Sequence, residues 1–481
     1  MHWIDLVIFV VYMLVMLGVG FYFMRRNTGQ EDYYVGGRNI GAWHIGLSVV
    51  ATDVGGGFSI GLGGLGFALG LSGSWMLFTG LLGAWIAAVF LIPRVKSDSA
   101  FSNFFTFPQV MGHLYNSTTA KVASIICFLG YLGFTASQLL AGAKLASGTF
   151  EALDISTALF IMGVIAVVYT VMGGLKAVIY TDTVQWIILM LGLMLIGVPM
   201  AYTYVGGWQE IQATLPSEFF SFSNLVWQDL VNWGITIIPI WFVGMTLYQR
   251  IFAARDTKSA KKAWFIAGLF EWPIMAFMGV SLGLLARVAV EQGILEGASA
   301  SMDPEMGLPI LLSQILPAGI LGLMMSAYFS AVLSTADSCL MAASGNLTTD
   351  LMGNVIKKWS HRAEVRISQW ITLFIGAVAL LLAWQMNEVL SLMLYSYAFM
   401  VSGLLVPVIF GLFFEKSNSK AAISSMVAGG GLTAGLTFLD LEMPLGLDPN
   451  IFGLLLSLIT FLLIDKLEPH TKTKTHRYAK I

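Results

Sequence analysis

Charged residues are scarce in this chain. Only 11% of its 481 residues are Asp, Glu, Lys or Arg, whereas 57% are hydrophobic and the mean hydropathy is +0.79. An average soluble domain has about 25% charged residues. The net charge of −2 also excludes the basic footprint of a nucleic-acid-binding protein. The composition therefore excludes a soluble protein and indicates one embedded in a membrane.

Several chemical motifs are also missing. The two cysteines, Cys127 and Cys339, both lie in apolar runs and predict no disulfide framework. The six histidines show no metal-ligand spacing, and there is no GxxxxGK phosphate loop. These absences argue against an enzyme and against ATP as the direct energy source.

Long apolar runs dominate what is present. Each is near the roughly 20 residues that cross about 30 Å of hydrocarbon. The first run is too long for the core of a signal peptide, so we expect a retained helix there. The run at 308–345 is long enough to include an outer loop helix. We count thirteen runs: 5–24, 41–70, 73–93, 121–147, 156–172, 178–203, 230–252, 262–287, 308–345, 367–385, 388–414, 420–439 and 450–465.

Positive charge is distributed unevenly between alternate loops. All Lys and Arg residues except Lys144 and Arg287 fall on one side, including the basic tail 466–481. The positive-inside rule makes that side cytoplasmic. With thirteen crossings, we expect a cell-membrane protein with its N-terminus outside and its C-terminus in the cytoplasm.

Two of the apolar runs contain helix-breaking residues. The run 41–70 contains 51-ATDVGGGFSIG-61, in which three consecutive glycines each cost a helix about 1 kcal/mol. The carboxylate of Asp53 at this depth costs about 2.5–3.5 kcal/mol more. Paired interruptions in two halves of a chain are typical of a transporter's midplane site. The second interruption falls in 230–252, at Gly234, Pro239 and Gly244.

Four acidic residues lie inside apolar runs: Asp53, Asp182, Glu271 and Asp337. No Lys or Arg lies deep enough to pair with all of them, so a metal ion, a proton or a cationic substrate group is expected nearby. Two of the four also have structural interpretations. Asp182 would cap a neighbouring helix, and Glu271 would accept a backbone donor freed by the kink at Pro273.

One face of the helix predicted around 326–345 carries oxygen atoms at helical spacing. Oxygen ligands suit sodium, and unwound carbonyls opposite a hydroxyl-bearing helix would complete such a site. The alternative is that each hydroxyl bonds back to the carbonyl four residues earlier, or helps helices to pack. The positions on this face are Ser330, Ser334, Asp337, Ser338 and Met341.

Five motifs of this sequence resemble the sodium/solute symporter family, which includes proline, pantothenate, choline, sugar and sialic acid carriers. The resemblance runs from about residue 5 to 465. It implies an all-α, polytopic, leucine-transporter-like fold: a five-plus-five inverted repeat with one extra helix before it and two after it. The motifs that carry it are 34-YVGGRNIG-41, 51-ATDVGGG-57, 169-YTVMGGLKA-177 with 180-YTDTVQ-185, 248-YQRIF-252 and 330-SAVLSTADS-338.

The resemblance also implies one transporter domain over 1–481 and positions for its sites. The domain comprises an extra helix (5–24), the repeats (41–203 and 230–414), two C-terminal helices (420–465) and a cytoplasmic tail (466–481). The implied sodium ligands are Ala51, Val54, Ala331, Ser334 and Thr335, with a second sodium at Asp182, Asp337 and Ser338. The expected substrate-binding residues are Asp53, Gly55, Gly56, Ser59, Gln138 and Trp241.

The expected function is therefore import of a small organic solute with sodium, by alternating access. The choline branch has tryptophan where this chain has Asp53, which argues against choline; an acidic residue there resembles the proline carriers. Proline and pantothenate- or monocarboxylate-like solutes are the candidates. The alternatives are a proton-coupled carrier that titrates Asp53 or Asp182, and a membrane sensor that binds solute without moving it. The expected partners are the solute, sodium and the bilayer, with no nucleic acid and with a functional monomer.

Overall fold

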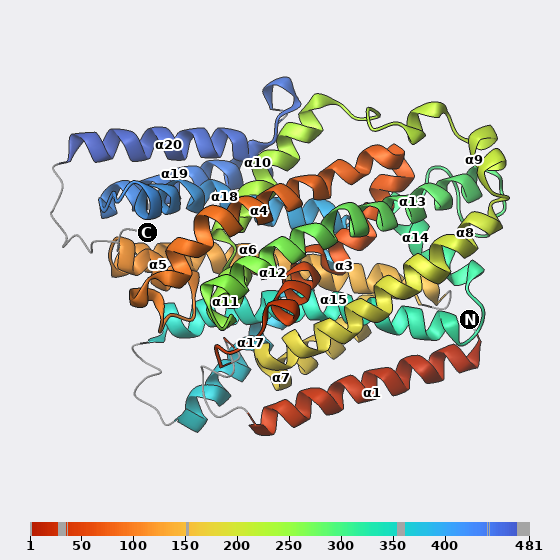
Figure 1. Cartoon of the computed structure of the whole chain (residues 1–481), viewed down its shortest axis with the longest axis horizontal. Coiled ribbons are helices and arrows are strands. Elements are labelled where there is room, and N and C mark those ends of the chain that lie inside the picture. The colour runs from red at the N-terminus through yellow and green to blue at the C-terminus, as the bar shows by residue number, and fades with distance from the viewer. Residues whose placement is uncertain are drawn as a thin grey trace.

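The computed structural model is an elongated bundle whose helices run along one axis (Figure 1). It describes residues 2–26, 35, 37–150, 153–353, 361–439, 441 and 443–468. Within these ranges the regular elements are helices, and the only β-pairing is an isolated bridge between Ile40 and Ala254. The predicted all-α, polytopic class is confirmed.

The first half of the chain contains the first of the two predicted breaks. Its runs at 156–172 and 178–203 both fall within the helical path formed by α7, η3 and α8. The elements are α1 (Trp3–Arg26), α3 (Ala42–Leu69), η1 (Gly70–Ser74), α4 (Trp75–Ser97), η2 (Ser99–Phe101), α5 (Phe107–Leu114), α6 (Ser117–Thr149), α7 (Ile155–Gly192), η3 (Leu193–Gly197), α8 (Val198–Tyr204), α9 (Trp208–Thr214) and η4 (Ser217–Phe220).

The second half contains the second break, and its predicted run at 308–345 divides into two helices, α14 and α15. The elements are α10 (Trp227–Val243), α11 (Met245–Ala253), α12 (Thr257–Leu269), η5 (Phe270–Met275), α13 (Ala276–Glu291), α14 (Pro304–Ile315), α15 (Ile320–Gly345), η6 (Asn346–Leu351), α17 (His361–Trp384), α18 (Val389–Phe413), α19 (Ser419–Phe438), η7 (Pro444–Gly446) and α20 (Pro449–Leu467).

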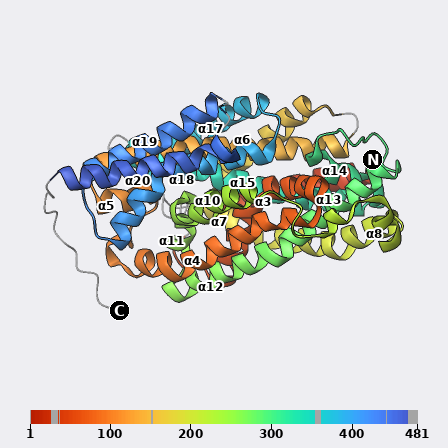
Figure 2. The same cartoon turned by 90° about the horizontal axis from the view of Figure 1, so that it is seen from above.

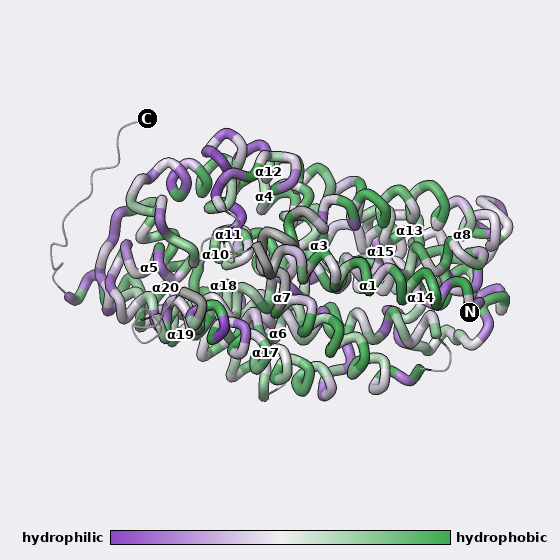
Figure 3. Tube along the Cα trace, turned by 90° about the horizontal axis from the view of Figure 1, so that it is seen from below, coloured by the Kyte–Doolittle hydropathy of each residue, from purple (hydrophilic) through white to green (hydrophobic). Residues whose placement is uncertain are grey.

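The bundle has the polarity of a membrane protein. Hydrophilic stretches gather at its two ends and hydrophobic stretches along its length (Figure 3). In the described part of the chain, nine helices are long and apolar enough to cross a membrane, or ten if α10 and α11 form one bent span. Two shorter apolar helices, Trp3–Val19 and Ile155–Val171, add to these. The total of thirteen stays a prediction.

Helices α3 and α15 occupy the middle of the bundle in both views, whereas α19 and α20 lie at its edge (Figure 2). In the most apolar 18-residue stretch of Ile320–Leu351, 89% of the residues are buried inside the protein. In the corresponding stretch of Pro449–Leu467, 22% are buried. A helix that carries Ser, Thr and Asp is stable at this depth only if its polar groups find partners in neighbouring helices. The centre of the bundle is therefore where a polar site belongs.

A network of charges ties three helices together at one end of the bundle. The Lys144 Nζ of α6 lies 2.5 Å from an Asp303 carboxylate oxygen and 2.6 Å from one of Glu305. Glu305 also accepts hydrogen bonds from the backbone N–H groups of Val389 and Leu390, at the start of α18. Glu305 thus satisfies backbone donors that have no partner inside their own helix. The network connects α14 to α6 and α18.

We expect Lys144→Met to destabilise the protein by about 3 kcal/mol, because it leaves Glu305 buried without its cation. The measurement is the thermal unfolding midpoint of the detergent-purified protein. Lys420→Met is the matched control, since the Lys420–Glu468 pair is exposed and such pairs contribute little. Equal midpoints for the two variants would contradict the role given to the network.

Candidate functional site

The central feature of the site is a break in α3 at Gly55. Its backbone angles, φ 43° and ψ −167°, are not helical, and the positive φ favours glycine. A Cβ atom at this position would lie 2.2 Å from the Thr335 hydroxyl of α15. Glycine therefore allows both the local conformation and the close approach of α15. The break predicted in the run 41–70 lies here.

Three of the five residues predicted to bind sodium meet beside this break. The Thr335 hydroxyl donates to the Ala51 carbonyl at 2.8 Å and lies 3.3 Å from the Ala331 carbonyl four residues earlier. A hydroxyl has one proton to donate, so we assign that proton to the shorter contact, which crosses to the Ala51 carbonyl of α3. Thr335 therefore does more than bond back within its own helix.

A fourth predicted ligand, Ser334, lies on the same stretch of α15. Its hydroxyl is buried and makes no aligned hydrogen bond within the described part of the chain, although it lies close to the Asp182 carboxyl group. A buried hydroxyl without a partner is costly and needs an explanation. The side chain of the fifth predicted ligand, Val54, lies outside the described residues.

The second predicted break lies at Gly244, between α10 and α11, where the chain bends by 42°. Pro239 lies within α10 rather than at the break. Tyr131 of α6 supports the start of α11, because its hydroxyl accepts from the Thr246 backbone N–H at 3.2 Å. At its other end, α11 is connected to the start of α3 by a hydrogen bond of 3.1 Å from the Ile40 N–H to the Ala253 carbonyl.

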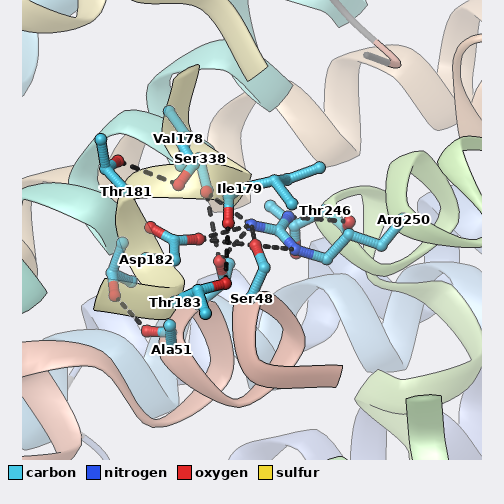
Figure 4. Close-up of polar contacts among 12 residues, drawn as sticks. Ser48, Ala51, Val178, Ile179, Thr181, Asp182, Thr183, Thr246, Arg250 and Ser338 are labelled. Atoms are coloured by element: carbon cyan, nitrogen blue, oxygen red, sulfur yellow. Dashed lines mark hydrogen bonds and ion pairs between the residues drawn. The ribbon is translucent and has the colours of Figure 1, made fainter. Parts of the chain in front are cut away.

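Helix α11 brings a buried arginine, Arg250, to the part of α3 that precedes the first break and to α15 (Figure 4). One guanidinium nitrogen, Nη2, donates to the hydroxyls of Ser48 at 2.9 Å, Ser338 at 2.9 Å and Thr52. The same nitrogen lies 3.8 Å from an Asp182 carboxylate oxygen. We call these five residues the arginine cluster. It joins α3, α7, α11 and α15.

The arginine cluster corrects two sequence-based interpretations. Arg250 was counted among the cytoplasmic loop cations, yet it is fully buried and pairs with a membrane carboxylate. Asp182 caps no helix in the described contacts; it accepts from the Ser48 hydroxyl at 2.5 Å. The motif 248-YQRIF-252 could have indicated a buried arginine, because it places Arg250 one turn before the end of a mainly apolar segment.

The residues predicted to hold a second sodium are only partly together. Asp182 and Ser338 belong to the arginine cluster. Asp337 points instead to α7, where one of its oxygens accepts from the Thr170 hydroxyl. Its other oxygen is buried and has no hydrogen-bond partner in the described residues.

Asp53, two residues before the break, and Glu271 form a pair of buried carboxyl groups. The two groups lie close enough to interact electrostatically. Tyr397 of α18 donates to one Asp53 oxygen at 3.2 Å, and the remaining three carboxyl oxygens have no hydrogen-bond partner in the described residues. Glu271 lies in the π-helical turn η5, but the prediction that it accepts a freed backbone donor there is wrong. Two buried carboxylates that interact in this way repel each other unless a cation or a proton compensates their charge.

The other residues predicted to contact substrate are dispersed. Gln138 donates to Ser137 at 3.3 Å and to the Met393 sulfur at 3.9 Å. Trp241 is fully buried and packs edge-on against Trp264, with ring centroids 6.3 Å apart. The structure describes only the backbone at Gly56 and Ser59. Of the six residues predicted to contact substrate, Asp53 and Gly55 lie at the break in α3.

Residues 33–429 match the model of the sodium:solute symporter family. The chain belongs to this family. The match includes both helix breaks, the arginine cluster and the hydroxyl-bearing face of α15. Sodium:solute symporters are membrane transporters, which agrees with the apolar helices described above.

Relatives of this symporter include proline transporters. The chain is 27% identical to the osmoregulated proline transporter OpuE of Bacillus subtilis, over 97% of this chain and 95% of that protein. It is 28% identical to the high-affinity proline transporter PutP of the same organism, over 86% and 88% of the two chains. A sodium/proline symporter of Staphylococcus aureus is 26% identical, over 94% and 89%.

Solved structures show the same fold. A Na⁺-coupled sialic acid symporter in a substrate-bound, outward-open state matches with a TM-score of 0.79 and 21% identity, covering 97% of this chain and 98% of that one. Mhp1, a nucleobase-cation-symport-1 transporter in a closed conformation, matches with a TM-score of 0.56 and 14% identity, covering 91% and 94%. The predicted leucine-transporter-like fold is confirmed.

Proposed function

We propose that this symporter imports a small organic solute together with sodium, and that proline is the first solute to test. The observation that carries the proposal is the convergence of the Ala51 carbonyl, the Ala331 carbonyl and the Thr335 hydroxyl at the break in α3. Oxygen atoms from an unwound helix and a hydroxyl-bearing helix are the donors that a sodium site needs. The proline transporters among the relatives support the choice of solute.

Sodium would act by holding α3 and α15 together. The Thr335 hydroxyl already connects them through Ala51, and Ser334 has a buried hydroxyl to contribute. An ion bound here completes the site while the carrier is open to the outside, and its loss to the cytoplasm releases α3 from α15. Inward movement of one charge supplies about 2.3 kcal/mol per 100 mV of membrane potential.

The substrate would bind on the Asp53 side of the break. The carboxyl pair Asp53–Glu271 suits a cationic group, and the ammonium group of an amino acid is one such group. Tyr397 orients Asp53 toward that position. A neutral sugar would leave the pair without a counter-charge, which favours an amino acid over a sugar.

The proposed carrier has a defined orientation in the membrane and works as a single chain. The positive-inside pattern supports a cell-membrane protein with its N-terminus outside and its C-terminus in the cytoplasm. In Figure 1, α1 begins at the same end of the bundle as α9, and α5 lies at the opposite end. The two repeats would span 41–203 and 230–414, and the carrier would work as a monomer.

The test is a panel of radiolabelled solutes offered to proteoliposomes with an inward sodium gradient. The panel contains L-proline, pantothenate, a short monocarboxylate, a sugar, sialic acid and betaine. We expect L-proline to accumulate above its external concentration. Binding of proline without accumulation would contradict transport and favour a sensor.

A further inference from the structure

Resting on the proposed function, we propose that Arg250 is a built-in cation at the second cation position, so that the carrier binds one sodium ion. The guanidinium lies among oxygens that the family resemblance assigned to a second sodium, Asp182 and Ser338. It comes from the second broken helix and reaches the two segments joined at the first, α3 and α15 (Figure 4).

The hydrogen-bonding capacity of Ser48 is fully used by this arrangement. Its hydroxyl accepts from the Arg250 Nε at 3.1 Å and from Nη2 at 2.9 Å. It donates its own proton to Asp182 at 2.5 Å. A serine hydroxyl has one proton and two acceptor sites, so no lone pair is left for a metal ion.

Thr52 and Ser338 also take part in this network. Both hydroxyl oxygens lie within hydrogen-bonding distance of Arg250 Nη2, whose two protons are shared with Ser48, and the two oxygens lie 3.2 Å from each other. The other terminal nitrogen, Nη1, donates to the Thr246 carbonyl at 3.2 Å. All three guanidinium nitrogens therefore have oxygen partners, which fixes the orientation of this planar group.

The charge balance of the Arg250–Asp182 pair leads to the same conclusion, because Asp337, the other predicted carboxylate, lies outside the arginine cluster and accepts from Thr170. Arg250 and Asp182 are both fully buried and together carry no net charge. A sodium ion placed beside them would meet the full positive charge of a guanidinium that does not lose its proton in proteins. At the first sodium site, Thr335 and Ala51 have no such cation in contact within the described part of the chain. The first sodium site therefore needs a cation from solution, whereas the second position already contains the guanidinium of Arg250.

Arg250 also helps to hold the two broken helices in register. The Ile40–Ala253 backbone bond joins α3 and α11 at one end, and Arg250 joins them a turn further in. Ser338 extends the connection to α15, the helix that supplies Thr335. A permanent cation at this position keeps α3 and α11 joined whether or not sodium is bound, and leaves the sodium-dependent contact between α3 and α15 to the first site.

The experiment counts sodium ions bound to the purified carrier with ²²Na⁺ at saturation. We expect one ion per wild-type protein. Arg250→Gln removes the internal cation and leaves Asp182 uncompensated, so we expect two ions per protein. Arg250→Lys keeps the charge and should bind one. Arg287→Gln is the control, because Arg287 pairs with Glu291 within α13 and should leave the count at one.

The outcomes separate this inference from the function on which it rests. Two sodium ions on the wild-type protein would overturn the place given to Arg250, even if Arg250→Gln failed to fold. A single ion on a folded Arg250→Gln variant would overturn it as well. No bound sodium on the wild-type protein would overturn the proposed function, and with it this inference.

Discussion

Replacement of Thr335 by alanine is expected to raise the sodium concentration for half-maximal uptake by about 10- to 100-fold. The Thr335 hydroxyl is the group that faces both α3 and α15, with 2.8 Å to the Ala51 carbonyl and 3.3 Å to the Ala331 carbonyl. Loss of an interaction with a charged partner costs about 1.5–3 kcal/mol, and about 1.4 kcal/mol corresponds to a factor of ten. The measurement is initial uptake of L-proline at varied sodium concentration.

Two companion variants make the result specific. Thr335→Ser keeps the hydroxyl and should restore most of the sodium affinity, whereas Ser334→Ala should lower it in the same direction as Thr335→Ala. Thr437→Ala is the matched control, because within the described residues the Thr437 hydroxyl bonds back to the Thr433 carbonyl of its own helix, α19, at the edge of the bundle. Unchanged sodium dependence in both Ser334→Ala and Thr335→Ala would show that the sodium site lies elsewhere.

Gly55→Ala is expected to abolish uptake almost completely while the protein still reaches the membrane. The new Cβ would lie 2.2 Å from the Thr335 Oγ1 and 2.9 Å from its Cβ, on a residue whose φ is +43°. An alanine in this left-handed conformation costs about 1–2 kcal/mol, before the clash with Thr335 is counted. To relieve this clash, α3 and α15 must move apart or change their local conformation. Either change disturbs the sodium ligands and the position of Asp53.

The control for this variant is Gly435→Ala. A Cβ at Gly435 meets no atom within 4 Å and the residue lies in α19, so alanine there should leave uptake unchanged. Membrane content of each variant is measured by immunoblot, and uptake is expressed per carrier. Wild-type uptake by Gly55→Ala would mean that the approach of Thr335 to the break is not needed for transport.

The two helix breaks were predictable because their causes are local. Clustered glycines destabilise a helix, and a carboxylate is costly inside a membrane, whatever the surrounding fold. The interruptions in the runs 41–70 and 230–252 could therefore be predicted without knowledge of the three-dimensional structure. The positions within them were less certain. Gly55 is one of three adjacent glycines, and the sequence alone does not show that this one takes the positive φ and lies against Thr335.

The partners of the buried charges could not be predicted, because they depend on contacts between distant segments. Arg250 lies near a group of loop cations, and nothing local shows that α11 turns its side chain toward Ser48 and Asp182. Glu271 is next to Pro273, which favoured a local explanation, yet it faces Asp53 from another helix. Identification of these pairs required the packing of α3 against η5 and α11.

The most direct test of the account exchanges the driving gradient. Proteoliposomes containing the wild-type carrier are given either an inward sodium gradient without a pH gradient, or an inward proton gradient in sodium-free buffer. The account predicts that L-proline accumulates only with the sodium gradient, and that a sodium ionophore abolishes the accumulation. Accumulation driven by the proton gradient without sodium would contradict the account.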